Sequence, residues 1–429
     1  MKKILFISFY FPPMGGIASI RSMNYARYLP TDNIKPLVLT IEPRLTRYPK
    51  DCQLLSKIKD TAIYRTKYFD LNWIFKLMWG LRLHKFVRWI QQNVLIPDVE
   101  SLWLPTARKA IDKIFMDNKD IRLVVTSGGP FSTFKLSKYI TNKYSVPYVL
   151  EFRDEWTNNP ARINLPYPVK STVKELNWES QLLVDCSGIV YLTEQMQRNF
   201  EAKHSFLCGR PSRIIPNGYD DSDFSATSNY VPSDKLHLVY CGSFYDRQQP
   251  DTIWSALAHL LDAKLIDANQ ISIDIYGNNN KNFVLGSFLE NPGLIQCIKL
   301  FPFISHAQSI QKMLAGDALL LFIASGKNTG ATVTGKIFDY MRSGKPILAI
   351  VPNNGIAAKM VNESNLGFVA DPDDPEMIQK KLLEIYHLWQ EGQLSKITPN
   401  SAFIQQFNRQ NLSHELASLI HEVTHDADE

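Results

Sequence analysis

A short segment late in the sequence combines the residue types that can hold a phosphorylated sugar. Gly335 opens a stretch with helical spacing, and Gly344 ends it before an apolar run. Backbone N–H groups at a helix N-terminus bind anions, and a glycine lets a phosphate approach them closely. Asp339, about one turn inside the helix, can accept hydrogen bonds from ribose or sugar hydroxyl groups. The segment therefore predicts a site for a nucleotide-diphosphate sugar, with the diphosphate near Thr334, Gly335 and Lys336.

This segment resembles the donor-binding segment of GT-B glycosyltransferases, particularly glycosyltransferase family 4, in which a Glu usually stands at the position of Asp339. A Tyr-x-Pro-Pro-x-Gly-Gly pattern that ends in Gly15 and Gly16, and a Pro-Asn-Gly-x-Asp pattern that contains Asn217, resemble the same family. The resemblance implies that the two glycines lie near the donor phosphates and that Asn217 lies at the crossing between two domains. We also expect Phe303 to border the base.

Three positions depart from the family pattern. The family usually has an Arg directly after Gly242 and a Lys five residues later, and this sequence has Ser243 and Gln248 there. Ala331 stands where the first of two paired glutamates is common. A cation near the leaving diphosphate stabilises the charge that develops on it. We expect the adjacent Arg247 to supply that cation, and Lys336 is a second candidate. A solvated arginine in a loop is the alternative that stays open for Arg247.

A charged motif follows an apolar run in the first half of the chain. Residues 151–156 resemble the D-x-R-D-x-W of a polysaccharide-synthesising subgroup of family 4, and residues 96–98 and 127–130 match the same subgroup. The end of a parallel strand lies at the carboxyl edge of its sheet, where substrates bind. We therefore expect Arg153 and Asp154 to be catalytic, with Asp154 positioning the acceptor. A salt-bridged strand end is the alternative that these residues leave open.

The elements that would position these residues follow from the alternation of short apolar runs with helical patterns, which is typical of βαβ units and parallel sheets. Two such series predict an α/β protein of the GT-B type, with two Rossmann-like doubly wound domains facing across a cleft. We place an acceptor-side domain in residues 1–215 and a donor-side domain in residues 216–402. Residues 403–429 would form a C-terminal helix and an acidic tail, and the resemblance implies that the helix crosses back to the first domain.

Composition excludes several other classes of protein. A hydrophobic fraction of 45% and a charged fraction of 21% are typical of a soluble globular enzyme. Five scattered cysteines without a C-x-x-C pair favour a reducing compartment and argue against zinc. Residues 330–336 fit a P-loop pattern, but Ile337 follows where that motif needs Ser or Thr. A pair of aspartates of the D-x-D type at the end of a strand would indicate a metal site. The sequence has no such pair at a predicted strand end, and Asp220-Asp221 falls in the hinge. We therefore expect no metal, and no cofactor besides the sugar substrate.

The first 110 residues are basic, with 18 Lys and Arg against 7 Asp and Glu. Within them, residues 64–90 combine aromatic and basic side chains at helical spacing. The candidates for acceptor or membrane contact are Trp73, Lys76, Trp79, Arg82, Lys85 and Arg88. This stretch is expected to form one helix or a pair of helices broken around Gly80. Two interpretations of its role stay open. It packs on the core of the domain, or it contacts a membrane surface or a lipid-linked acceptor. A nucleic-acid motif does not accompany the charge.

Together, the resemblance implies a retaining glycosyltransferase that moves a sugar from a nucleotide-diphosphate sugar to a glycan or lipid-linked acceptor. The expected setting is bacterial surface polysaccharide assembly in the cytoplasm or at the inner face of the membrane. Two alternatives remain. An inverting transferase or a nucleotide-sugar epimerase can use the same fold. A non-catalytic partner of another transferase would account for the missing Glu, Arg and Lys.

Overall fold

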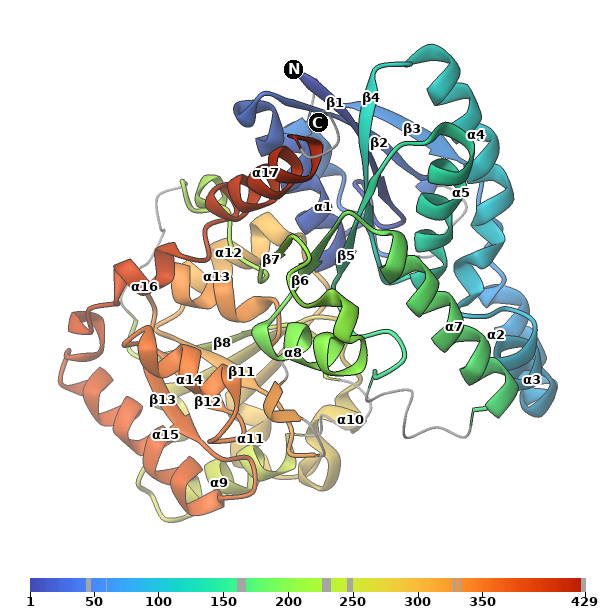
Figure 1. The fold of residues 1–429 in the computed structure, drawn as a ribbon. Coiled ribbons are helices and arrows are strands. Elements are labelled where there is room, and N and C mark those ends of the chain that lie inside the picture. The colour runs from blue at the N-terminus through green and yellow to red at the C-terminus, as the bar shows by residue number, and fades with distance from the viewer. Residues whose placement is uncertain are drawn as a thin grey trace. The chain divides into compact units, whose positions relative to one another are not determined.

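The computed structural model describes residues 1–43, 48–58, 60–159, 167–225, 233–244, 250–326, 329–331 and 333–425. The chain forms two compact units. Unit 1 comprises Met1–Asn217 and Arg409–Glu429, and unit 2 comprises Gly218–Asn408. The boundaries expected from the sequence were 215/216 and 402/403, so Asn217 falls in unit 1 rather than in the second unit. Figure 1 shows the elements of each unit.

Unit 1 contains a seven-stranded sheet in the order β3-β2-β1-β4-β5-β6-β7. Every neighbouring pair of strands is parallel. The strands are β1 (Lys2–Ser8), β2 (Ile34–Ile41), β3 (Ala62–Thr66), β4 (Ile121–Ser127), β5 (Tyr148–Phe152), β6 (Gly188–Tyr191) and β7 (Ser212–Ile214). The order reverses between β1 and β4, which makes their carboxyl ends the topological switch point where ligands bind in such sheets.

Helices cover both faces of this sheet (Figure 1). They are α1 (Ile17–Tyr28), α2 (Asn72–Gly80), α3 (His84–Asn93), α4 (Leu104–Asp117), α5 (Phe134–Tyr144), α7 (Val169–Asp185), α8 (Glu194–Lys203) and α17 (Arg409–His425). Successive side chains of a strand point to opposite faces. In β1, Leu5 and Ile7 therefore pack in the cluster that includes α4 and α5 residues, whereas Ile4 and Phe6 pack in the cluster of α1 and α17.

Unit 2 repeats this architecture with six parallel strands in the order β10-β9-β8-β11-β12-β13. Its strands are β8 (Leu236–Cys241), β9 (Ile271–Tyr276), β10 (Ile298–Phe301), β11 (Ala318–Phe322), β12 (Ile347–Ile350) and β13 (Gly367–Ala370). Its helices are α9 (Asp251–Asp262), α10 (Lys281–Leu285), α11 (Pro292–Cys297), α12 (His306–Ala315), α13 (Lys336–Ser343), α14 (Ile356–Glu363), α15 (Pro375–Gln390) and α16 (Ser401–Gln405). Its switch point lies between β8 and β11.

The C-terminal apolar pattern forms two helices rather than the single helix expected over residues 403–423. Helix α16 ends at Gln405, and α17 begins at Arg409. Ile404 is buried in the core of unit 2, whereas Leu416 and Ile420 are buried in the core of unit 1. The apolar spacing continues across the break because both helices bury one face, so periodicity alone does not show that the two faces belong to different cores.

A buried ion pair joins three segments of unit 1. Arg21, on α1, is 2% exposed, and its Nε lies 2.7 Å from Oε1 of Glu151 on β5. The other two guanidinium nitrogens donate to the backbone oxygens of Pro216, at 2.6 Å, and Ile215, at 2.8 Å. Burial raises the pKa of Glu151, but the guanidinium outweighs it and the pKa falls below its ordinary value. The pair therefore fixes α1 and the exit of the chain against the centre of the sheet.

We predict that Arg21→Met destabilises the protein by about 3–5 kcal/mol, because it leaves the Glu151 carboxylate buried without its partner. Urea unfolding followed by circular dichroism measures the effect. The double variant Arg21→Met/Glu151→Gln should regain part of the loss. Arg198→Met, which removes an exposed pair with Glu194, is the control and should change stability by less than about 1 kcal/mol. Equal effects of Arg21→Met and Arg198→Met would contradict the assignment.

Candidate active site

Residues predicted to bind the donor meet at the switch point of unit 2. Lys336 is the first residue of α13, Gly335 is its N-cap, and Nζ of Lys336 lies 2.9 Å from the hydroxyl of Tyr240 on β8. A Cβ on Gly242 would lie 2.4 Å from that Nζ, so the ammonium packs against the loop after β8. Burial lowers the pKa of Lys336 to about 8. Beside it, the buried hydroxyl of Thr334 has no hydrogen-bond partner among the described residues.

The loops after β8 and β9 hold each other through their backbones. The N–H of Gly242 donates to the oxygen of Tyr276 at 2.8 Å, and a Cβ on Gly277 would lie only 2.3 Å from the Gly242 oxygen. Asn279 bridges the same loop, because its Nδ2 donates to the Gly242 oxygen and its Oδ1 accepts from the N–H of Phe244. Glycine is therefore required at 277 by close approach of two backbones, and the loop that carries Gly242 has a fixed course.

Ser243 has a structural partner in this loop. Its Oγ accepts a hydrogen bond of 2.9 Å from the N–H of Asn278. The position where family 4 usually has an Arg thus ties the β8 loop to the β9 loop. Arg247, expected to replace the missing charge, and Gln248 lie outside the described residues. Among the described residues, Lys336 is the cation in contact with this loop.

Asp339 is buried, with 9% exposure, in the first turn of α13. One of its oxygens lies 3.1 Å from Nε2 of His306, and Nδ1 of the same imidazole lies 3.7 Å from a carboxylate oxygen of Asp223. His306 begins α12, and sequence reasoning missed it because no motif surrounds it. Phe303, in the loop just before α12, is 47% exposed. The arrangement offers a carboxylate whose orientation is fixed by His306 and, in the loop before α12, an exposed aromatic ring.

The remaining donor candidates lie in unit 1. Gly15 donates its N–H to the oxygen of Pro49 at 2.8 Å, and Gly16 is the N-cap of α1 with a φ of 94°. That dihedral strains any residue with a side chain, so Gly16 is required by the turn itself. Asn217 is the last residue of the first segment of unit 1 and is partly buried. The glycine loop therefore forms a tight turn directly before α1.

Arg153 and Asp154 follow β5 at the carboxyl edge of unit 1. Nε of Arg153 donates to the oxygen of Gly128 at 2.9 Å, and its Nη2 contacts the oxygen of Gly129. Its guanidinium also lies 5.6 Å from the ring centroid of Tyr10. Arg153 thus holds the loop after β4 in place, whereas the side chain of Asp154 is exposed beside that loop. The motif at residues 151–156 indicated Arg153 as a catalytic candidate, and its role in holding the loop after β4 was not predicted.

A cluster of carboxyl and phenol groups near Tyr10 was not predicted. The Tyr10 hydroxyl donates to Tyr48, which donates to Oε1 of Glu100 at 3.2 Å. Burial, together with the nearby charge of Asp98, raises the pKa of Glu100 to about 7. The buried hydroxyl of Tyr68 has no hydrogen-bond partner among the described residues. The sequence signals near this cluster were the Ile-Pro-Asp motif that ends at Asp98 and the Tyr-x-Pro-Pro-x-Gly-Gly pattern that begins at Tyr10.

A cavity of about 550 Å³ lies beside the cluster. Its wall includes Tyr48, Asp70, Asn72, Phe75, Lys76 and Trp79. Lys76 and Trp79 are two of the residues that the sequence predicts on the acceptor side. Apolar walls with a few oriented polar groups are typical of small-molecule sites. The cavity and the cluster together define the candidate acceptor site in unit 1.

Helices α2 and α3 form a hairpin that buries little of its own surface. Phe75 and Val87 pack with Leu95 in a small cluster. The large apolar side chains left exposed are Trp73, Leu77, Trp79, Leu81, Leu83, Phe86 and Trp89. The predicted basic residues Lys76, Arg82, Lys85 and Arg88 are exposed on the same hairpin. Across the described parts of the chain, no helix has both the length and the apolar character needed to cross a membrane.

Comparisons with known proteins agree with this arrangement. Residues 221–401 match the family model described as glycosyl transferases group 1. Comparison with curated protein sequences gives no match. Among solved structures, sucrose-phosphate synthase from Thermosynechococcus elongatus is 14% identical, with a TM-score of 0.60 over 99% of this chain and 100% of that one. WaaG, a glycosyltransferase involved in lipopolysaccharide biosynthesis, is 14% identical, with a TM-score of 0.61 over 97% and 99%. A mutant of S. aureus TarM in complex with fondaparinux, alpha-GlcNAc-glycerol and UDP is 12% identical, with a TM-score of 0.61 over 98% and 99%.

These findings define the class of the protein. The two parallel sheets are those of the GT-B fold, and the site around Lys336 lies within the glycosyl transferases group 1 region. The chain is a glycosyltransferase of the GT-B class. Membership of family 4, expected from the sequence motifs, stays a prediction.

The protonation of Glu100 should be visible in the pH dependence of stability. Its pKa lies above the ordinary value of 4.5, so the folded protein binds a proton that the unfolded chain releases. Stability should therefore fall as the pH rises from about 4.5 through 7. In Glu100→Gln the side chain is always neutral, so we predict an unchanged Tm at pH 5 and a Tm raised by about 2–4 °C at pH 8.

Differential scanning calorimetry at both pH values measures this difference. Glu290→Gln, at an exposed position of unit 2, is the control and should shift Tm equally at the two pH values. A Glu100→Gln shift that does not depend on pH would show that Glu100 is ionised throughout.

Proposed function

We propose that the protein is a metal-independent, retaining glycosyltransferase that uses a nucleotide-diphosphate sugar. The observation that carries this proposal is the contact of Lys336 with Gly242 and Tyr240 at the β8–α13 switch point, within the glycosyl transferases group 1 region. Helix N-termini and glycine loops bind phosphate through backbone N–H groups. The partly buried ammonium of Lys336 gains an ion pair when a diphosphate binds beside it.

The residues of unit 2 divide the donor among them. Lys336, the Thr334 hydroxyl and the first N–H groups of α13 hold the diphosphate. Asp339, oriented by His306, accepts hydrogen bonds from the ribose hydroxyls, and Phe303 stacks on the base. Two solved structures of this fold contain UDP or a UDP-sugar: S. aureus TarM with UDP, and the trehalose-6-phosphate structure from E. coli with UDP-2-fluoro glucose. The nucleotides in these two structures support a nucleotide-diphosphate donor for this chain.

The transfer itself needs no protein nucleophile. The bond between the sugar C1 and the diphosphate oxygen breaks with its electron pair on the diphosphate, where Lys336 stabilises the charge. The acceptor hydroxyl attacks C1 on the face that the diphosphate leaves, and its proton passes to the departing phosphate oxygen. The sugar keeps its configuration. On unit 1, Asp154 and the Glu100 cluster position the acceptor.

We predict that one nucleotide-diphosphate sugar in a panel raises the Tm of the wild-type protein. A ligand at about 100 times its Kd adds about 2.7 kcal/mol to the free energy of unfolding. The gain should be lost in Lys336→Met and in Asp339→Ala, and kept in the exposed controls Lys299→Met and Asp373→Ala. Because Asp339 also contacts His306, the Tm of each variant without nucleotide is measured first.

Measuring enzymatic turnover distinguishes the proposed retaining transferase from an inverting transferase and from a non-catalytic partner. Release of nucleoside diphosphate only when an acceptor is present, with a product anomer like that of the donor, supports the proposal. An inverted product would contradict retention. Binding without turnover would favour the non-catalytic partner, which is the second candidate because Ser243 serves the loop structure where the family has an Arg.

We further propose a lipid-linked or membrane-bound acceptor, reached at the inner face of the cytoplasmic membrane through the α2–α3 hairpin. Exposed Trp and Phe beside Lys and Arg favour the headgroup region of a bilayer, and anionic lipids add about 1 kcal/mol for each cation near the surface. The other interpretation is that the hairpin only packs on the core of the unit. The exposure of its Trp residues disfavours that interpretation.

We expect the variant Trp73→Ser/Trp79→Ser/Phe86→Ser/Trp89→Ser to lose at least tenfold in binding to vesicles that contain phosphatidylglycerol. Sedimentation with the vesicles measures binding, and the far-ultraviolet spectrum checks folding. Val169→Ser/Val184→Ser, which removes exposed apolar side chains from α7, is the control. Unchanged sedimentation of the hairpin variant would remove the membrane from the proposal.

A further inference from the structure

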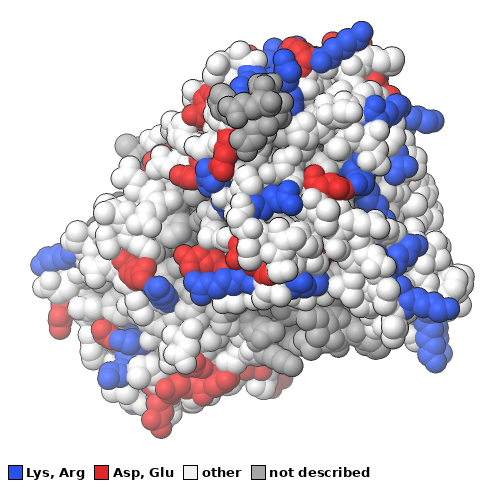
Figure 2. Space-filling view, viewed as in Figure 1, with Lys and Arg blue, Asp and Glu red and all other residues white. Residues whose placement is uncertain are grey.

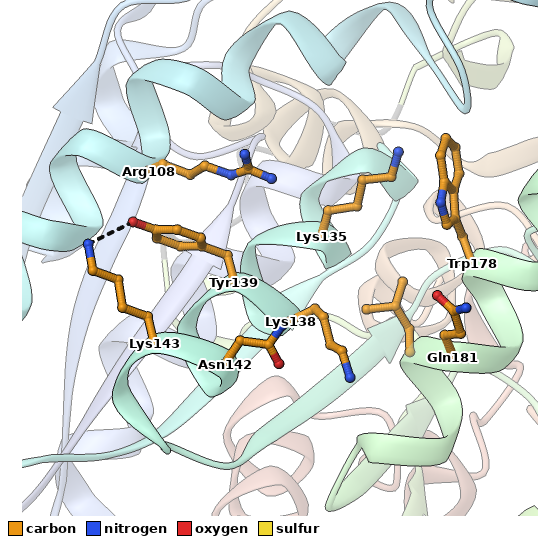
Figure 3. A pocket seen from close by; sticks show the side chains of 9 residues that line it. Arg108, Lys135, Lys138, Tyr139, Asn142, Lys143, Trp178 and Gln181 are labelled. Atoms are coloured by element: carbon orange, nitrogen blue, oxygen red, sulfur yellow. Dashed lines mark hydrogen bonds between the residues drawn. The ribbon is translucent and has the colours of Figure 1, made fainter.

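A second cavity in unit 1, of about 640 Å³, opens between helices α4, α5 and α7. Four of its lining residues are cations: Arg108 on α4, and Lys135, Lys138 and Lys143 on α5. The cavity wall includes no carboxylate. Figure 3 shows Arg108 above the ring of Tyr139 and Lys135 beside Trp178, with both cationic groups in the upper part of the view. Four positively charged side chains therefore line one cavity.

Two of these cations have anionic partners at the rim, and two do not. Lys138 pairs with Asp185, and Nζ of Lys143 lies 2.8 Å from Asp112. Within the described ranges, Arg108 and Lys135 make no ion pair. Their contacts are with aromatic rings: the Arg108 guanidinium lies 5.2 Å from the ring centroid of Tyr139, and Nζ of Lys135 lies 3.1 Å from that of Trp178.

The carboxylates nearest to Lys135 are engaged elsewhere. Asp98 accepts hydrogen bonds from the N–H and the hydroxyl of Ser132, and Glu175 accepts from Nε1 of Trp156. Burial lowers the pKa of Lys135 to about 8, and the positive charges of Lys174 and Arg108 also lower it, although Asp98 and Glu175 act in the opposite direction. The folded unit thus maintains neighbouring cations at a cost in free energy that a bound anion would relieve.

The chemistry of the wall specifies the anion. A guanidinium offers a planar fork of donors to phosphate oxygens, and an ammonium adds a point charge. The amides of Asn142 and Gln181 line the same cavity and suit hydroxyl groups. We propose that this cavity is a second binding site, separate from the donor site, for a phosphate ester carried on a polyhydroxylated group, with the phosphate between Arg108 and Lys135.

Two sources carry that chemistry: a soluble sugar phosphate, and the headgroup of an anionic lipid. The surroundings allow both. The α2–α3 hairpin packs through its cluster on Val99 and Leu102, just before α4 begins. Lys and Arg predominate along the right-hand edge of the view in Figure 2, where Figure 1 shows α4, α5, α7 and the hairpin. The experiment therefore has one arm for each source.

In the first arm, glucose 6-phosphate is titrated into the full chain by calorimetry at pH 8, in two buffers of different ionisation enthalpy. In the second arm, the protein is sedimented with phosphatidylcholine vesicles containing phosphatidylinositol. The test variant is Arg108→Gln/Lys135→Gln. The matched control is Lys109→Gln/Lys113→Gln, which removes the same charge from exposed positions of α4 outside the cavity. Both arms are repeated in Lys336→Met, in which the donor site is disabled.

We expect saturable binding in at least one arm, weakened at least tenfold in the test variant and less than twofold in the control, and unchanged in Lys336→Met. Binding of the sugar phosphate at pH 8 should be accompanied by proton uptake that Lys135→Gln abolishes. Binding in the first arm identifies a soluble ligand, and binding in the second alone identifies a lipid headgroup. Absence of binding in both arms, or equal losses in test and control variants, would overturn the proposal. Loss of binding in Lys336→Met would assign the anion to the donor site instead.

Discussion

A guanidinium without access to water organises the carboxyl edge of unit 1. Arg21 gives hydrogen bonds to a carboxylate of β5 and to the two carbonyl groups at which the chain leaves the unit. Desolvating such a pair is expensive, and the attraction between the partners offsets part of that cost, although Oε2 of Glu151 has no hydrogen-bond partner among the described residues. Glu151 is two residues from Arg153, and Arg153 fixes the loop after β4 by bonds to two glycine carbonyls. Two arginines near the carboxyl end of β5 therefore hold the exit of the chain and the loop after β4.

Unit 2 orders its switch point by a different device. Its loops are held by backbone hydrogen bonds and by the close approach of Gly242 and Gly277, with Asn279 as a bridge. Among the described residues, Lys336 is the cation in contact with this loop. A loop whose course is fixed by its backbone suits a site that would hold phosphate charge as it develops, because the donors are in place before the reaction begins.

The motifs near strand ends could be predicted from the sequence, because alternating βαβ patterns place strand ends at one edge of a sheet. The family resemblance predicts that Gly242, Gly335 and Lys336 belong to one donor site, and the structure brings Lys336 into contact with Gly242. The Glu100 cluster and His306 could not be predicted in this way. They are brought to their sites by helices and loops whose course depends on packing, and a single Glu or His in a sequence carries no pattern of its own. The break between α16 and α17 was missed for the same reason, since two different cores bury one continuous apolar stripe.

That stripe also determines the order in which the protein can fold during synthesis. Ile4 and Phe6 are covered by Leu416 and Ile420, which follow them by more than four hundred positions in the chain. Unit 2 is encoded entirely between these partners. On the ribosome, all of unit 2 emerges before α17 exists to cover one face of the first sheet. The first strands of unit 1 therefore lack this cover until all of unit 2 has been synthesised, and unit 1 completes its core only after α17 has emerged.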